Sequence, residues 1–294
     1  MTFAKKNMKE QMIQSVLQNL YLSSYAYRYS TAIKDYKRRM SVTDFMRRAA
    51  DLGFRGVTLY ENVRKPKWST DELRAICETA VEKNLGIELG LNGLSYKTLK
   101  QDIELAETMK CNSIRLVIGE SFLEKYDSKT EQIDVVNMEL SRVESDLKRA
   151  GIRLGIENHF DLTTQELVRI VNNFDKDVVG YIFDTSNCLG FLEKPEETLS
   201  QMNGRIYSVH LKDFNIIKRN KTEYVIFGTT IGQGKLDVRG ILKSSIDNNP
   251  GIVVVLELSI PRPYKNITIA NLVAWEDSIV IENYRLLKKA IEDL

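Results

Sequence analysis

Four polar residues interrupt apolar runs in the second half of the chain, each near the point where a predicted strand ends. They are Glu157 in LGIENH, Asp184 in YIFDTSN, His210 in YSVHLKD and Glu257 in VVLELS. Three carboxylates and an imidazole would repel one another and lose hydration if they packed together without a neutralising cation. Because the set offers only oxygen and nitrogen donors, it suits Mn, Mg, Co or Fe. The four residues therefore predict a divalent metal site; the alternative is a buried salt-bridge network with Lys212 and Arg115.

The elements that would position these residues follow a regular alternation of short apolar runs and amphipathic stretches. Buried parallel strands have apolar sequences of this kind, and helices between them indicate βαβ units. Eight such runs are present, at 18–27, 56–62, 86–92, 113–119, 151–158, 180–187, 206–213 and 251–259. Eight strand–helix pairs predict an α/β fold of the (β/α)8 barrel type, as one domain that spans residues 1–294. In such a barrel the carboxyl ends of the strands meet at one mouth, which would bring the four polar residues together.

Local signals indicate where the first helices begin and end. Ser41 precedes an amphipathic stretch with Asp44 three residues further on, and Gly53 closes that stretch. Thr70 precedes the next amphipathic stretch, which contains Glu72. A hydroxyl residue followed by an acid in the first turn is typical of a helix N-terminus, and glycine is typical of the position that ends a helix.

The connection before the last predicted strand is much longer than its neighbours. The excess falls in the polar stretch 215–237. Active sites of α/β barrels lie on the loops that follow the strands, so this insertion is predicted to be an active-site loop. Gly228, Gly232 and Gly234 would let it close over a bound molecule, and a solvated hairpin is the alternative.

Composition limits the classes of partner. The chain has 42 basic and 40 acidic residues, whereas proteins that bind nucleic acid through its phosphates usually show a basic excess. Its three cysteines lie far apart, which excludes a closed disulfide framework. No run approaches the roughly 20 apolar residues of a membrane helix, and residues 1–16 are predicted as an N-terminal extension or helix without a signal-peptide pattern. We therefore expect a cytoplasmic protein that binds neither nucleic acid nor membrane; a homo-oligomer and a heteromeric complex are the two assemblies considered.

The motifs around the four polar residues resemble those of a known superfamily. GIENH, FDTSN, VHLKD and the strand-end Glu257 are similar to the metal motifs of the xylose isomerase-like TIM barrels, the superfamily of sugar phosphate isomerases and epimerases. The branches that the chain resembles include ketose 3-epimerases, inosose dehydratases and proteins that cleave or decarboxylate oxidised sugars. The resemblance implies one divalent metal, with manganese expected first and magnesium, cobalt, iron or zinc as alternatives. The ligands that it implies are Glu157, Asp184, His210 and Glu257.

The resemblance also implies a reaction. A metal of this kind polarises a carbonyl group while a carboxylate removes the neighbouring proton, which gives an enediolate intermediate. Glu157 and Glu257 would form the acid/base pair. We predict His159 as a further acid/base group, because its side chain would face the same side as Glu157 if the strand continued; a hydrogen bond to a ligand carboxylate is its alternative role. The predicted function is therefore a metal-dependent isomerase or epimerase that acts on a keto-sugar or related polyol.

Other functions remain open at the same site. Ketose 3-epimerases often carry a histidine three residues after the aspartate of the sixth strand, where this chain has Asn187. The alternative is therefore a lyase or dehydratase that acts on an oxidised sugar, including cleavage of a C–C or C-glycosidic bond. An endonuclease IV-like phosphodiesterase needs a multi-zinc site rich in histidine, and this chain has 2 histidines. The remaining alternative is a non-catalytic partner subunit, although such a subunit would not need a complete set of metal-ligating residues.

Further polar residues near the predicted strand ends are candidates for binding the sugar or polyol. Packing within a loop or within the barrel is the alternative role for each of them. The candidates are Tyr25, Arg28, Glu61, Asn92, Arg115, Asn187, Lys212 and Arg262. Arg262 lies in an IPRP turn, where a guanidinium group would suit a carboxylate or a phosphate.

Overall fold

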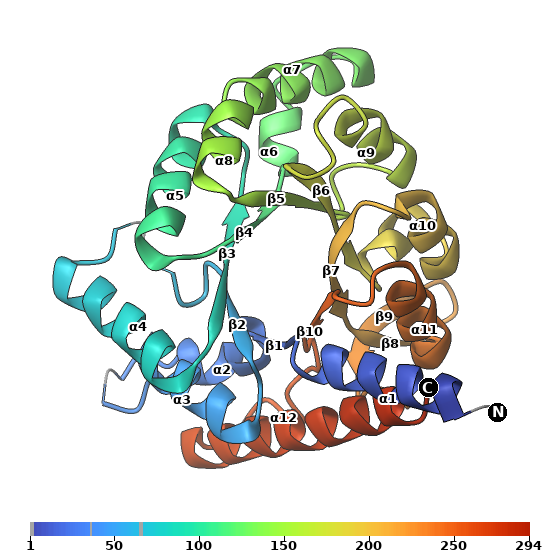
Figure 1. Cartoon of the computed structure of the whole chain (residues 1–294). Helices are drawn as coiled ribbons and strands as arrows, with labels where there is room; N and C mark the ends of the chain where they lie inside the picture. The colour runs from blue at the N-terminus through green and yellow to red at the C-terminus, as the bar shows by residue number, and fades with distance from the viewer. Residues whose placement is uncertain (1–2, 36, 65–66) are drawn as a thin grey trace.

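Eight parallel strands close into a barrel at the centre of the molecule (Figure 1). The computed structural model describes residues 3–35, 37–64 and 67–294. Around the barrel the strand order is β1-β10-β7-β6-β5-β4-β3-β2, and pairing of β1 with β2 closes the ring. The barrel strands are β1 Leu20–Ser23, β2 Gly56–Leu59, β3 Gly86–Asn92, β4 Ser113–Val117, β5 Arg153–Glu157, β6 Val179–Asp184, β7 Ile206–Leu211 and β10 Val253–Leu256. The predicted single-domain (β/α)8 fold is confirmed.

Helices form a ring around the outside of the barrel (Figure 1). Parallel neighbours need a crossover connection, and here the crossovers are helical. The helices are α1 Phe3–Leu17, η1 Ser24–Tyr27, α2 Arg28–Thr31, α3 Val42–Leu52, α4 Thr70–Lys83, α5 Tyr96–Met109, α6 Glu120–Leu123, α7 Lys129–Ser141, α8 Glu144–Ala150, α9 Thr164–Val171, η2 Asn187–Phe191, α10 Pro195–Met202, α11 Val238–Asn248 and α12 Ile269–Glu292. The helices cover the outer face of the strands and the barrel interior encloses the inner face, so β2, β6 and β7 are buried along their whole length, which explains their apolar sequences.

Several strands end earlier than their apolar runs predicted. The prediction of a first strand at 18–27 was too long, because the chain turns into the 3-10 helix η1 directly after Ser23. The Ser23 hydroxyl accepts the N–H of Tyr25 and so stabilises this turn. The prediction of a last strand at 251–259 was also too long, and Glu257 is the first residue after β10. Candidate site residues that follow these strands therefore lie in the short helices and loops after them, as Tyr25 does in η1 (Ser24–Tyr27).

The helix-start signals were right for α3 and one residue off for α4. The capping box at Ser41 is present, and Gly53 ends α3 with a left-handed φ of 100°. The N-cap of α4 is Ser69 rather than the predicted Thr70. The reason is spacing, since the Glu72 side chain can bond back to the N-cap backbone only from three residues further on.

The N-terminal helix packs near the end of the barrel where the strands begin. Residues 3–16 of the predicted extension belong to α1, and residues 1 and 2 lie outside the described part of the chain. The Ser15 hydroxyl donates to the carbonyl of Pro250, just before β10, at 3.2 Å. In Figure 1, α1 lies beside α12, and the two helices are in contact. This helix is therefore remote from the carboxyl ends of the strands.

The predicted insertion at 215–237 contains an antiparallel hairpin. Its strands are β8 Asp213–Lys218 and β9 Tyr224–Thr229. After β9 the chain wraps around the carboxylate of Asp213, which accepts the N–H groups of Gly232 and Gly234 at 2.9 Å. Gly232 has a φ of 78°, and a Cβ at Gly234 would collide with Asp213. Both glycines are thus explained by the tight turn, while closure of the loop over a ligand stays a prediction.

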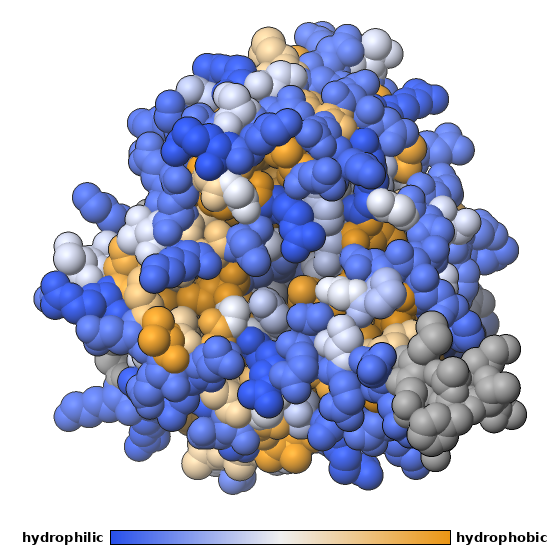
Figure 2. All heavy atoms as spheres, in the orientation of Figure 1, coloured by the Kyte–Doolittle hydropathy of each residue, from blue (hydrophilic) through white to orange (hydrophobic). Residues whose placement is uncertain are grey.

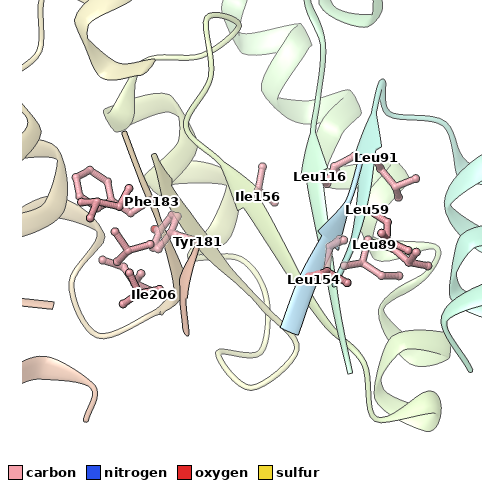
Figure 3. Close-up of a cluster of buried hydrophobic side chains, with 14 of the residues drawn as sticks. Leu59, Leu89, Leu91, Leu116, Leu154, Ile156, Tyr181, Phe183 and Ile206 are labelled. Carbon is pink, nitrogen blue, oxygen red and sulfur yellow. The ribbon is translucent and has the colours of Figure 1, made fainter. Parts of the chain in front are cut away.

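Apolar side chains fill the space between strands and helices. Figure 3 shows part of this core, with Leu89 of β3, Leu154 of β5 and Phe183 of β6 among the labelled side chains. Figure 2 shows that hydrophilic residues cover most of the outer face in view. Within the described residues, no helix combines the length and the apolar character that crossing a membrane requires.

A glycine in β3 makes room for an aromatic ring beside the site. A Cβ at Gly90 would collide with the ring of Tyr60, which is fully buried and places its hydroxyl 3.2 Å from Nδ1 of His210. We expect Gly90→Ala to lower the free energy of unfolding by about 1–3 kcal/mol, because overpacking a filled core displaces the ring. Chemical denaturation measures this change. Gly251→Ala is the control, since a Cβ there would make only an ordinary contact at 3.7 Å; equal losses in both variants would contradict the explanation.

Candidate active site

The four predicted ligands lie at the carboxyl ends of neighbouring strands. Glu157 ends β5, Asp184 ends β6, His210 is the penultimate residue of β7 and Glu257 directly follows β10. In the strand register, Asp184 pairs with His210, and His210 pairs with Val255, two residues before Glu257. All four side chains are buried. The barrel therefore brings together residues that are up to a hundred positions apart in the sequence.

Three of these residues could hold one metal ion. Ligand atoms of Glu157, Asp184 and His210 all lie within 4.8 Å of one another. Glu257 is adjacent, because its Oε2 lies 3.5 Å from Nδ1 of His210, the same nitrogen that lies 3.4 Å from Oε2 of Glu157. The imidazole thus presents Nδ1 toward the carboxylates of two other strands.

Backbone contacts fix the orientation of the Asp184 carboxylate. Its Oδ1 accepts the N–H groups of Ser186 at 2.9 Å and of Asn187 at 3.0 Å. The side chain of Asn158 pairs with the backbone of Asp184 on both sides, since its Nδ2 donates to the carbonyl and its Oδ1 accepts the N–H. With Oδ1 occupied, Oδ2 remains for a cation.

Two side chains hold the Glu157 carboxylate. Asn187 donates its amide N–H to Oε1 at 2.8 Å, and Nε of Arg115 donates to Oε2 in a close ion pair. Burial disfavours the charged form of Glu157, but Arg115 and His210 outweigh burial and hold the pKa of this carboxyl well below its usual range. Glu157 is therefore an ionised, rigidly held ligand candidate.

His210 is held from its other side by residues inside the barrel. Its Nε2 lies 3.4 Å from Oε1 of Glu88, whose Oε2 accepts the Ser113 hydroxyl at 2.9 Å. The hydroxyl of Tyr60 lies 3.2 Å from Nδ1 and 3.3 Å from Nε2 of the imidazole. Burial alone would lower the pKa of His210, but its contacts with Glu157 and Glu88 raise that pKa to about 10.

A lysine ammonium bridges the two remaining carboxylates. Nζ of Lys212 lies 2.7 Å from Oδ2 of Asp184 and 2.8 Å from Oε1 of Glu257. Burial opposes the charge on this amine, but the two carboxylates outweigh it and raise the pKa of Lys212. The salt-bridge network with Lys212 and Arg115, the alternative drawn from the sequence, is thus present around the metal-ligand candidates.

The donor set nevertheless fits a divalent ion. Within the described residues, Oε2 of Glu257 and Oδ2 of Asp184 are buried without a hydrogen-bond partner, and they lie 3.5 Å from Nδ1 of His210 and 2.7 Å from Nζ of Lys212 respectively. A buried carboxylate oxygen without a hydrogen bond costs free energy unless a cation satisfies it. Hard oxygen donors with one imidazole nitrogen suit Mn, Mg, Co, Fe or Zn.

A cavity of about 460 Å³ adjoins these residues at the barrel mouth. Most of the predicted site residues line it: Tyr25, Arg28, Glu61, Asn92, Arg115, His159, Asn187, Lys212 and Glu257. The hairpin contributes Phe214, Ile226, Phe227 and Gly228 to its wall. The predicted insertion thus covers one side of the cavity, and the apolar side chains it contributes suit the C–H face of a sugar.

Some predictions about individual residues need adjustment. The premise for His159 was wrong, because β5 ends at Glu157; His159 still lines the cavity, in edge contact with Phe160. The side chain of Arg262 is exposed and does not line the cavity, and only its backbone N–H bonds to the Tyr29 hydroxyl. Their roles stay predictions.

Sequence reasoning missed three residues that hold the candidate ligands. Glu88 and Tyr60 contact His210, and Asn158 orients Asp184. A signal for Glu88 was present, since a carboxylate in the middle of the apolar run GIELGLN needs a partner. No local pattern marked Tyr60 or Asn158.

Comparison with known proteins agrees with this architecture. The 3-oxo-isoapionate decarboxylase of Pectobacterium atrosepticum is 24% identical over 194 residues, which cover 66% of this chain and 68% of that protein. The structure of an L-ribulose 3-epimerase has a TM-score of 0.69 at 13% identity and covers 93% of this chain and 94% of its own. The structure of the IOLI protein with a bound zinc atom has a TM-score of 0.64 at 17% identity, with 92% and 99% covered.

At these identities, the two solved structures show the fold alone. The family model described as xylose isomerase-like TIM barrel matches residues 46–279, which include all four candidate ligands and most of the barrel. The chain therefore belongs to the xylose isomerase-like TIM barrel family.

Proposed function

We propose that this protein is a divalent-metal-dependent enzyme that removes a proton next to the carbonyl group of a keto-sugar or related polyol, with isomerisation or epimerisation as the outcome. The observation that carries the proposal is the convergence of Glu157, Asp184 and His210, with ligand atoms within 4.8 Å of one another, beside a cavity of about 460 Å³. Manganese is the metal we propose first.

The residues divide into ligands and groups that face the substrate. Glu157, Asp184, His210 and Glu257 would hold the ion, which when bound would supply Lewis acidity to a carbonyl oxygen. Both oxygens of Glu157 accept hydrogen bonds, from Asn187 and Arg115, whereas Glu257 lines the cavity and its Oε2 accepts no hydrogen bond from the described residues. We therefore assign proton abstraction to Glu257 in preference to Glu157. His159 lines the same cavity and would exchange a proton with the substrate on a second side.

The second candidate function uses the same residues for elimination or bond cleavage on an oxidised sugar. Two observations favour it: the 24% identical relative is a decarboxylase, and Asn187 stands where ketose 3-epimerases often have histidine. The buried cations Arg115 and Lys212 also line the cavity, and a cation near the carbonyl would stabilise negative charge that develops there. Isomerisation and elimination break a C–H bond next to the carbonyl, whereas decarboxylation or cleavage breaks a C–C bond there. In each case the electron pair left next to the carbonyl can take up a hydrogen from solvent.

Solvent deuterium exchange tests the step that the two functions share. Metal-loaded protein incubated in D2O with a panel of ketoses, cyclitol ketones and oxidised sugars is expected to incorporate deuterium next to the carbonyl of at least one of them, as seen by NMR. Glu257→Gln, assayed at a metal concentration that saturates it, should slow this exchange by about 10²- to 10⁴-fold, the usual contribution of a positioned base. The same spectra separate an epimer or isomer from an elimination or cleavage product.

The control for this experiment is Glu61→Gln, which changes a carboxylate that lines the cavity but lies outside the metal-ligand candidates. We expect it to alter substrate affinity and to leave the exchange rate at saturation largely intact. Metal-loaded protein that exchanges no proton of any carbonyl compound in the panel would contradict the proposal.

A further inference from the structure

One cation at the cavity has no acidic partner. Arg115 pairs with Glu157, and Lys212 pairs with Asp184 and Glu257, but within the described residues no carboxylate lies within 4.0 Å of the Arg28 guanidinium. The carboxylates that line the cavity are engaged elsewhere, since Glu61 accepts the Tyr25 hydroxyl at 2.6 Å and Glu257 contacts Lys212. A half-buried guanidinium that forms no ion pair is a candidate for binding an anion.

The structure holds this guanidinium in place through one of its nitrogens. Nη2 of Arg28 donates to the carbonyl of Ile260 at 2.7 Å and to the hydroxyl of Tyr29 at 3.0 Å, and the guanidinium also lies over the Tyr29 ring at 4.8 Å. A guanidinium has five N–H groups, so those on Nε and Nη1 remain without a partner among the described residues. Arg28 is thus oriented but not satisfied.

The segment that carries Arg28 is itself fixed from α12. The carboxylate of Glu276 accepts the N–H groups of Tyr29 and Ser30, each at 2.8 Å, and the Ser30 hydroxyl at 2.5 Å. The charge of Arg28 acts on this carboxylate, but the two groups form no ion pair within 4.0 Å, and the three hydrogen bonds engage both oxygens of Glu276. It therefore positions the backbone next to Arg28 instead of pairing with the guanidinium.

We infer that Arg28 binds the carboxylate of the substrate, so that the substrate is a sugar acid rather than a neutral sugar. This inference rests on the proposed function, because it places the carbonyl end of the same molecule at the metal-ligand candidates. Arginine matches carboxylates through charge-assisted hydrogen bonds. A phosphate usually gathers several donors from a glycine-rich turn or a helix N-terminus, whereas Arg28 is the one unpaired cation among the described residues that line this cavity.

Matched pairs of sugars test the inference by calorimetric titration of the metal-loaded protein. The pairs are glucuronate with glucose, galacturonate with galactose, and gluconate with glucitol, and glucose 6-phosphate is added as a phosphate probe. We expect the acid of at least one pair to bind about 10- to 100-fold more tightly than its neutral counterpart, as charged hydrogen bonds allow. Arg28→Gln should abolish this preference, because it should weaken binding of the acid far more than binding of the neutral sugar.

Arg149→Gln is the matched control, because it removes the same charge from an exposed position on α8 that does not line the cavity. Its preference for the acid should equal that of the wild type. If Arg28→Gln does not fold, titration of the matched sugars into the wild type and into Arg28→Lys still tests the inference. Arg28→Lys keeps the charge and should retain only part of the preference for the acid.

Several results would overturn the inference: no pair that prefers the acid, an equal loss in both arginine variants, or tighter binding of glucose 6-phosphate than of every sugar acid. Its failure is distinguishable from failure of the proposed function. Deuterium exchange on neutral ketoses without any preference for acids would overturn the inference alone. An Arg28-dependent preference for acids in a protein that exchanges no proton would overturn only the proposed function.

Discussion

Purified wild-type protein is expected to carry a near-stoichiometric divalent ion, and His210→Ala and Glu257→Gln are expected to lose it while they keep their fold. Nδ1 of His210 is the one imidazole donor among the clustered ligand atoms, and it lies within 3.5 Å of two carboxylate oxygens from other strands. Removing a residue that only supports a ligand typically costs roughly 10- to 100-fold in metal affinity, and removing a ligand should cost more. Elemental analysis beside circular dichroism measures both quantities.

A graded control separates loss of a ligand from general damage to the site. Glu88→Gln keeps a side chain of the same size beside Nε2 of His210 but removes the negative charge of that side chain. The variant should therefore lose only about 10- to 100-fold in metal affinity. Asp71→Asn, an exposed acid on α4, should change nothing. If the wild type neither carries nor regains a divalent ion, the four residues form a structural polar network and the proposed mechanism fails.

The barrel could be predicted because its signals are local and repeated. Each strand is an apolar run, and amphipathic helical stretches alternate with these runs, so errors at single boundaries did not disturb the topology. The predicted strand and helix boundaries were wrong where a single side chain determines the boundary. Ser23 turns the chain after β1, and Ser69 rather than Thr70 caps α4 because Glu72 must be three residues away.

The candidate ligands could be predicted because polar residues at the ends of apolar strands stand out, and the fold brings strand ends together. Their supporting residues could not. Glu88 bonds to Ser113 and contacts His210, partners that lie 25 and 122 positions further along the chain, and no sequence spacing reports such a meeting. The exposure of the Arg262 side chain could not be predicted either, because it depends on how the loop after β10 packs on Tyr29.

The ion pairs of Lys212 are expected to make the metal-free protein sensitive to this one side chain. Removing one member of a buried ion pair leaves the others uncompensated and typically costs about 3–5 kcal/mol. Lys212→Met should therefore lower the free energy of unfolding of metal-free protein by that amount, because Asp184 and Glu257 would lose their ammonium partner. Lys148→Met is the control, since its ion pair with Asp175 is mostly exposed and such pairs contribute at most about 1 kcal/mol.

Adding a divalent ion should restore most of the stability of Lys212→Met and stabilise the wild type less. The physical reason is that the ammonium contacts Oδ2 of Asp184, an oxygen that the ion would also use, so in the wild type the ion must displace an existing positive charge. Denaturation of both proteins with and without manganese measures the difference, and the variant should also bind manganese more tightly. A loss of stability that manganese does not reverse would mean that Lys212 belongs to a permanent salt-bridge network, which is the reading that competes with the metal site. Reversal by manganese would mean that the ammonium and the ion neutralise the same carboxylates in turn, and that Lys212 is released toward the cavity when the ion binds.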